Sequence, residues 1–228
     1  MLLNDRNTVI KFILAGIMLF GLFVLTFFLD EHSRKFFIKE GGVLESATAL
    51  GYFLCVAMMA YRGRLAYIKK YYHIFTLIIL FMLRELDFDT RFTTTGIFKI
   101  RFYTSANVPV LEKIIGVMII ALLLYIIFTI IQRHLRDFLI NLKKQDIIAV
   151  GVFLTCALLG ISQCLDGFDR KLKGLGLEVS HRLSLNAGAI EEIAELGVPI
   201  IILITLCAYF KKNRGSQNTA SDETSSTP

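Results

Sequence analysis

Carboxylates at the ends of apolar segments are the residues in this sequence whose type and spacing could support chemistry. They are Glu45, Glu85, Asp87, Asp89, Glu112, Asp166, Glu191, Glu192 and Glu195. An Asp at the centre of a membrane helix costs roughly 2.5 to 3.5 kcal/mol, and less near the helix ends, so such acids usually face a protein interior or an aqueous cavity. Clustered carboxylates can bind protons, and their oxygens also suit hard divalent cations such as Mg²⁺, Ca²⁺ or Mn²⁺.

The densest group of acids opens the last apolar segment, where Glu191, Glu192 and Glu195 share one side of a helix. At about 100° per residue they fall within an arc of roughly 100°, and the next basic residue of the segment is Lys211. Their repulsion must therefore be offset by another segment, a proton or a metal ion. Pro199 lacks an N–H group and predicts a kink here, which fits either a binding site or simple packing.

Acidic and basic side chains alternate at the end of the third apolar segment. If that segment is one helix, Glu85 and Asp89 lie within about 40° of each other. Arg84 and Arg91 flank Asp87 at helical spacing, so these groups can neutralise one another. Glu85 and Asp89 are then the less compensated pair, which either lines a polar cavity or belongs to an ion-paired helix end.

Two further acids open the second and fourth apolar segments. Glu45 lies three residues before Thr48 in a stretch rich in small residues, so both can face a cavity where helices approach closely. Glu112 follows Asn107, a residue type that caps helices, and Pro109, which suits a first helical turn. An acid there also suits the helix dipole, and we interpret Glu112 as a helix-start residue.

The overall composition excludes an ordinary soluble domain. Of 228 residues, 55% are hydrophobic and 19% are charged, and the mean hydropathy is +0.62, which is typical of a polytopic membrane protein. The net charge of +6 reflects membrane topology and anionic headgroups rather than nucleic acid, for which we find no binding motif. The lipid bilayer is therefore the predicted partner, and the oligomeric state stays open.

Six apolar segments are long enough to cross a hydrocarbon layer of about 30 Å, which predicts an all-α, polytopic membrane bundle. Their approximate ranges are 8–29, 41–61, 72–89, 108–132, 147–165 and 188–210. The first segment lacks a small-x-small cleavage site and is interpreted as a retained span rather than a signal peptide. Residues 211–228 are rich in Ser, Thr and Asn, and we predict a disordered cytoplasmic tail.

The distribution of Lys and Arg orients the predicted bundle. With a cytoplasmic N-terminus, the inner segments hold twelve of these residues and the outer loops hold ten. The inner loops are also shorter, which favours an arrangement with both termini inside (N-in, C-in). By the parity of the crossings, the nine acids named above then share the outer leaflet.

Cysteines and histidines argue against several kinds of site. The cysteines are Cys55, Cys156, Cys164 and Cys207, each inside an apolar segment and without metal-type spacing. The histidines are His32, His73, His134 and His181, all isolated in the sequence. Two of them fall at inner ends, so a three-histidine zinc site cannot form at one leaflet. The acidic pair at 191–192 is similar to that of membrane CAAX-type proteases, but the histidine motifs of that family are missing.

Aromatic or aliphatic residues alternate with basic ones in three outer loops, at 34–39, 98–103 and 168–173. Such segments suit a membrane interface, with rings at the boundary and cations toward the phosphates. Simple anchoring is one interpretation, and contact with a lipid headgroup or a phosphate is the other.

Three short blocks resemble an uncharacterised group of bacterial polytopic inner-membrane proteins. They are Gly-Gly-Val-Leu-Glu at 41–45, Arg-Glu-Leu-Asp-Phe at 84–88 and Glu-Glu-Ile-Ala-Glu at 191–195. The resemblance implies a location in the bacterial inner (plasma) membrane, and it carries no activity.

Three functions remain open for the polar cluster predicted at the outer leaflet. The cluster comprises Glu45, Thr48, Arg84, Glu85, Asp89, Arg91, Glu191, Glu192 and Glu195, with Glu45, Glu85, Asp89, Glu191 and Glu195 as candidate metal ligands. It could hold a divalent cation and bind or act on a lipid-linked phosphate. It could serve a proton- or cation-coupled transporter, although the inner half lacks polar steps. The third possibility is an accessory or assembly protein whose buried ion pairs join helices.

Overall fold

The chain folds into helices throughout the part that the structure describes. The computed structural model describes residues 6–29, 42–174, 176 and 180–225, and these contain no strand. The helices are α1 (Arg6–Phe28), α3 (Val43–Lys70), α4 (Tyr72–Glu85), α5 (Phe88–Phe92), α6 (Ile100–Thr104), α7 (Val110–Lys143), α8 (Ile147–Leu165), α9 (Phe168–Gly174) and α10 (His181–Ser225). The all-α prediction is confirmed for these residues.

Five helices are long and apolar enough to cross a membrane, namely α1, α3, α7, α8 and α10. In the most apolar window of α7 the mean hydropathy reaches 3.1, because Ile and Leu fill most of its positions. Large apolar side chains such as Phe20 on α1 and Met118 on α7 are exposed, as expected for helices that face lipid. The chain is therefore an integral membrane protein.

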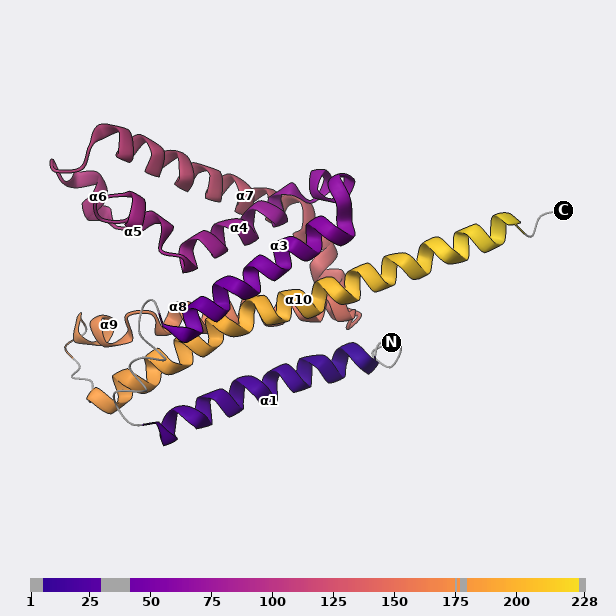
Figure 1. Ribbon diagram of the computed structural model, residues 1–228, viewed down its shortest axis with the longest axis horizontal. Coiled ribbons are helices and arrows are strands. Elements are labelled where there is room, and N and C mark those ends of the chain that lie inside the picture. Colours follow the sequence, from indigo (N-terminus) through magenta and orange to yellow (C-terminus); the bar gives the residue numbers. More distant parts are fainter. Residues whose placement is uncertain (1–5, 30–41, 175, 177–179, 226–228) are drawn as a thin grey trace.

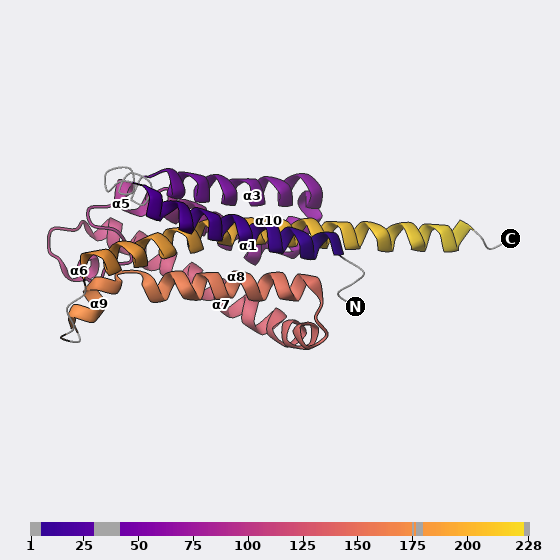
Figure 2. The same cartoon turned by 90° about the horizontal axis from the view of Figure 1, so that it is seen from below.

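Helix α10 is the centre of the bundle. It runs between α3 and α1 in Figure 1, and α8 lies along it in Figure 2. In its apolar window 67% of the residues are buried, against 11% for α1 and 17% for α7. A helix that is apolar on all sides and packed on several neighbours is buried in this way, so side chains of α10 can meet three other helices.

The predicted third span is not one continuous helix, which corrects the expected range of 72–89. Helix α4 ends at Glu85 after 14 residues, a length of about 21 Å. Asp87 then adopts a left-handed conformation with φ 50°, and its N–H bonds back to the carbonyl of Arg84. Asp tolerates this conformation better than most residues, and the chain restarts as α5 at Phe88.

A close seam joins α3 to α10 at Gly51 and Pro199. A Cβ atom on Gly51 would lie 2.9 Å from two ring carbons of Pro199, so only glycine allows this approach. One turn further on, Cys55 Sγ donates a hydrogen bond to the Pro199 carbonyl at 3.3 Å. Helix α10 continues through Pro199 to Ser225, so the kink expected at the proline does not interrupt the helix.

Beyond this seam the bundle interior is a central apolar cluster shared by α3, α4 and α10. It consists of Tyr52, Cys55, Met59, Ile78, Val198, Leu206 and Phe210. These side chains face one another across the three helices, and their burial stabilises the packing of α3, α4 and α10.

The two ends of the bundle differ in the elements that they carry. One end has α5, α6 and α9, together with the end of α8 and the start of α7 (Figure 1). The other end has the turns that join α3 to α4 and α7 to α8, and the start of α1. We call these the α9 end and the α1 end. Under the predicted orientation the α9 end corresponds to the outer leaflet.

The C-terminal part of α10 extends beyond the other helices (Figure 1). The structure continues this helix over residues 211–225, where the composition predicts a disordered segment. A helix that is already nucleated gains one hydrogen bond for each residue it adds, and the next proline after Pro199 is Pro228. A prediction from the composition of residues 211–225 ignores the long packed helix that precedes them, and this helix continues into the segment.

Asp146 anchors the start of α8 at the α1 end. Its carboxylate accepts a hydrogen bond from the Ile148 N–H at 3.0 Å and pairs with Lys212 Nζ of α10 at 2.6 Å. Partial burial acts to raise the pKa of the Asp146 carboxyl, but the bonds from Lys212 and Ile148 outweigh it, and the net pKa lies below the ordinary value. Asp146 therefore both caps α8 and ties it to α10.

Replacing Asp146 with alanine is expected to lower the free energy of unfolding by about 1 to 2 kcal/mol at pH 7, mainly through the lost cap. Because the folded-state pKa is depressed, this stabilisation is present above the unfolded pKa of about 3.9 and is lost as pH falls through the folded value. Unfolding of the detergent-purified protein at several pH values measures it. Asp137→Ala, at an exposed position on α7, is the control, and equal stability of the Asp146 variant and wild type at pH 7 would contradict the prediction.

Candidate functional site

Glu195 lies at the meeting point of three helices near the α9 end. It is 8% exposed, and its Oε1 atom accepts hydrogen bonds from Arg84 Nη2 of α4 at 3.1 Å and Ser162 Oγ of α8 at 2.7 Å. Ser162 is three residues from the end of α8, which places these contacts about one helical turn inside that end. We call Arg84, Glu85, Ser162 and Glu195 the Glu195 node.

Glu85 is the second buried acid of the node. It is 7% exposed, and its Oε1 lies 4.0 Å from Nη1 of Arg84. Arg84 is its only ion-pair partner in the described part of the chain. One guanidinium therefore serves two buried carboxylates, and with both acids ionised the node would carry one uncompensated negative charge.

The guanidinium links the buried acids to the surroundings of the bundle. The Arg84 side chain is 41% exposed, while those of Glu85 and Glu195 are 5% and 11% exposed. Arg84 occupies the last turn of α4, where a long side chain can extend past the helix end. The node is thus a polar site with buried acceptors and one partly accessible cation.

The ion pairs predicted within the third segment are wrong. Arg84 contacts Glu195 of α10 and its own neighbour Glu85, and it does not pair with Asp87. The left-handed conformation of Asp87 ends α4, so residues before and after it no longer follow one helical periodicity. This break also separates Glu85 from Asp89, which an unbroken helix would place on one face.

Asp89 and Arg91 lie on α5 beyond the break. The backbone carbonyl of Asp89 accepts a hydrogen bond from Thr93 Oγ1 at 2.6 Å, and a Cβ atom on Gly96 would lie 3.1 Å from the Asp89 carboxylate. Arg91 is exposed. The structure thus gives both residues a place in the α5 loop rather than in the node.

The remaining predicted site residues lie on α3 and α10, in helical turns near the α9 end. Thr48 is buried, and its hydroxyl donates to the Leu44 carbonyl of its own helix at 2.9 Å. Glu45 is half-buried in the first turn of α3. Glu191 and Glu192 are half-buried on α10, one turn before Glu195. These acids surround the node, while the direct contacts belong to Arg84, Ser162 and Glu195.

The candidate metal ligands do not form a ready-made cage. Across the residues that the structure describes, no three His, Cys, Asp or Glu side chains are grouped so that they could hold a metal ion. Mg²⁺ often needs only one or two carboxylates and takes its other oxygens from water and phosphate. A divalent ion at this site would therefore share its coordination with ligands from outside the chain.

Glu112 is a helix-start residue, as its position indicated. It lies in the first turn of α7, and its Oε2 accepts hydrogen bonds from both the N–H and the hydroxyl of Thr94 at 3.0 Å. Pro109 occupies the cap position, and no side chain caps the helix there, so the role expected of Asn107 is wrong. Glu112 fastens the α5–α6 loop to α7.

Sequence reasoning missed a histidine pair at the α1 end. Nε2 of His73, at the start of α4, lies 2.7 Å from Nε2 of His134, on the last third of α7. The isolation of the two residues in the sequence argues against any joint role. The available signal was that the two residues fall at the same end of consecutive predicted spans.

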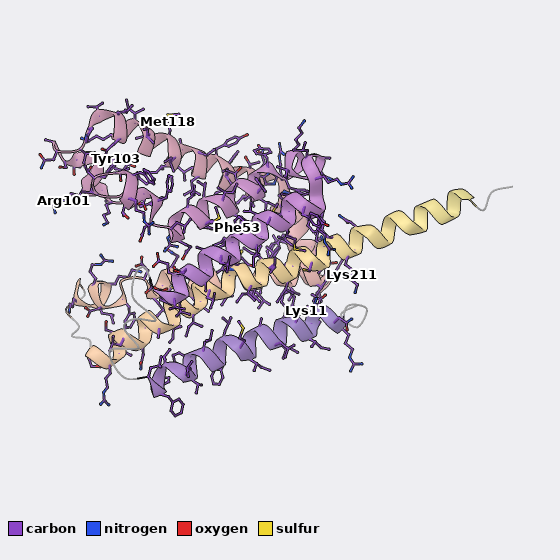
Figure 3. The ribbon with its side chains drawn as sticks, in the orientation of Figure 1. Lys11, Phe53, Arg101, Tyr103, Met118 and Lys211 are labelled. Carbon is purple, nitrogen blue, oxygen red and sulfur yellow. The ribbon has the colours of Figure 1, made fainter. Side chains whose placement is uncertain are left out.

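A hollow of about 510 Å³ lies between α1 and α10 at the α1 end. Lys11 of α1 and Lys211 of α10 are among its lining residues and lie near each other in Figure 3. Glu195 is 16 positions before Lys211, or about 24 Å along α10. This hollow is therefore separate from the Glu195 node.

No known protein family, curated protein or solved structure matches the chain.

Proposed function

We propose that the chain is a six-span protein of a bacterial inner membrane that binds a proton at the Glu195 node and couples it to transport across the membrane. Helices α4 and α5 together form the third crossing, and both termini are cytoplasmic. The excess of basic residues in the short inner loops supports this orientation. The short α4, followed by a break beside buried acids, is the kind of discontinuous helix found at transporter sites.

The sharing of Arg84 by two buried carboxylates is the observation that carries this proposal. An uncompensated buried charge costs several kcal/mol, so Glu85 and Glu195 together favour taking up one positive charge. A proton is the smallest such charge and needs no further ligands. Glu195 is held by Arg84 and Ser162, which leaves Glu85 as the carboxylate free to gain and lose the proton.

Proton flux in liposomes tests the proposal. The full chain is reconstituted with a pH-sensitive dye inside the vesicles, and a pH gradient is imposed. We expect flux above that of protein-free vesicles, and we expect Glu85→Gln to lower it about tenfold or more, because an amide cannot carry the proton. Glu112→Gln, which changes a carboxylate outside the node, serves as the matched control.

Two outcomes of this experiment overturn the proposal: no flux above the protein-free vesicles, or equal flux for wild type and Glu85→Gln. A variant that loses stability or complex recovery with no change in flux would favour the accessory or assembly function. In that case the node would serve only to join α4, α8 and α10.

A second candidate function is binding of a lipid-linked phosphate through a divalent cation. The observation that favours it is the set of basic side chains exposed directly after the node, Arg91 on α5 with Lys99 and Arg101 at the start of α6. Cations of this kind suit phosphate oxygens, and the acids could share a Mg²⁺ ion with them. Titration of the purified protein with Mn²⁺, with and without a polyprenyl phosphate, tests this candidate, and the lack of any bound ion in both arms removes it.

A further inference from the structure

His73 and His134 form a contact that the Glu195 node does not explain. Their Nε2 atoms are 2.7 Å apart, and the ring centroids are 5.0 Å apart with the ring planes inclined by 27°, so the rings meet edge to edge. His73 is 1% exposed, whereas His134 is half-buried. In the described part of the chain, Nδ1 of His73 is the one buried side-chain nitrogen or oxygen without a hydrogen-bond partner. Buried unpaired atoms are rare in proteins, so this nitrogen calls for an explanation.

The contact can hold one hydrogen. A bond between the two Nε2 atoms needs one N–H donor and one bare acceptor, and two N–H groups at this distance would repel. With both rings neutral and His73 as the donor, its Nδ1 is a bare acceptor and the hydrogen of His134 is on its own Nδ1. An incoming proton can therefore bind Nδ1 of His73 without breaking the contact.

Proton passage through the pair balances. A proton binds Nδ1 of His73, the hydrogen between the rings moves to Nε2 of His134, and His134 releases its Nδ1 proton. One positive charge enters on the buried side and one leaves on the half-buried side. The pair can then carry a proton back in the reverse direction, whereas a second passage in the same direction first requires both rings to exchange tautomers.

The groups around the pair are aromatic, with few charges. Tyr71 stacks on His134 at 6.1 Å, and Tyr72 meets His73 edge-on at 5.3 Å. Tyr209 of α10 donates a hydrogen bond to the Tyr71 hydroxyl at 3.2 Å. The charged groups that act on the pair are Arg133 and Asp137 of α7. Asp137 favours a cationic pair and Arg133 opposes it, while Lys70 of α3 lies over the neighbouring Tyr71 ring.

Helix α4 connects this pair to the Glu195 node. It carries His73 near its first residue and Glu85 at its last, about 18 Å apart along the axis. Ile78, between them, belongs to the central apolar cluster. Polar groups that accept protons thus lie at both ends of one short helix, with a dry segment between them.

We propose that the His73–His134 pair is a second proton-binding site, at the α1 end, which exchanges with the cytoplasm the proton that the Glu195 node exchanges at the α9 end. The role in transport rests on the proposed function. The binding of one shared proton by the pair follows from the contact between the two Nε2 atoms, and it can be measured without a transport assay.

Nitrogen NMR of the full chain, with ¹⁵N-labelled histidine and in lipid nanodiscs, tests the pair directly. We expect a coupling across the Nε2–H···Nε2 bond, and a joint titration in which a proton added to one ring changes the other. His134→Gln should remove both signals from His73. Tyr72→Phe, which keeps the ring beside His73 and loses only the hydroxyl that contacts Tyr125, should leave them unchanged. Independent titration of the two rings without a coupling overturns the inference.

Flux in the liposome assay separates this inference from the proposed function. We expect His73→Gln to lower flux about tenfold, with Tyr72→Phe at the wild-type rate. If wild type shows flux and His73→Gln shows the same flux, the role of the pair in transport is overturned. The Glu195 node then remains as the proton site. Absence of flux in wild type overturns the proposed function, and the NMR result then decides the proton binding of the pair by itself.

Discussion

Replacing Arg84 with glutamine is expected to lower the free energy of unfolding by about 3 kcal/mol, the largest effect of any single change near the node. Loss of one partner from a buried ion pair typically costs about 3 to 5 kcal/mol, because the other charge is left buried and unpaired. Here two acids, Glu85 and Glu195, lose the same partner. We take the lower end of the range because the Arg84 side chain is 41% exposed to its surroundings.

If the loss of stability in Arg84→Gln comes from an unpaired buried charge, then removing that charge in a double variant should restore part of it. In Arg84→Gln combined with Glu195→Gln, the carboxylate that Arg84 contacts most closely is also gone, so part of the lost stability should return, by about 1 kcal/mol or more. Denaturant unfolding of the four proteins of this cycle measures the coupling. Arg91→Gln, at an exposed arginine of α5, is the matched control and should change stability by less than about 0.5 kcal/mol. A coupling of zero would mean that Arg84 acts through packing alone.

Replacing Gly51 with leucine is expected to cost about 3 kcal/mol by separating α3 from α10. Even one added carbon would lie 2.9 Å from the ring of Pro199, and a larger side chain cannot be accommodated without moving a helix. Overpacking of this kind costs about 1 to 3 kcal/mol, occasionally more. The same movement would weaken the bond between Cys55 and the Pro199 carbonyl.

Gly160→Leu is the matched control for this seam. Gly160 is a glycine of α8, and a Cβ atom added to it would meet nothing within 4 Å, so leucine there adds helix propensity without a clash. Thermal unfolding in detergent should place Gly51→Leu well below wild type and Gly160→Leu close to it. Similar values for the two variants would show that the seam tolerates a wider helix spacing.

The class of the protein and the side on which its acids gather were predictable from the order of residues. Long apolar runs must form helices in a bilayer, because every backbone polar group needs a partner inside the segment. The alternation of crossings then decides which segment ends meet. The alternation brings Arg84, Glu85 and Glu195 to one end of the bundle, and the structure places Arg84 in contact with both acids.

Partners within a segment were less predictable than the segments themselves. Helical spacing makes Asp87 and Arg84 natural partners, but the chain leaves the helix at Asp87, where φ is 50°. A local pattern assumes that the helix continues, and nothing in the spacing itself marks the residue at which it stops. In the same way, the composition of the residues after 210 predicts a segment separate from α10, whereas the structure continues α10 to Ser225.

The order of residues alone is enough to specify an all-helical membrane protein with nine of its acids at one end, because hydrophobic length and crossing parity depend on nothing else. Which of these acids matter to one another follows from the packing of the helices. Glu195 meets Ser162 and Arg84 across 33 and 111 residues, and His73 meets His134 across 61. Such contacts depend on which helix faces pack together, and on small residues such as Gly51 that set the distance between helices, and these are properties of the assembled bundle.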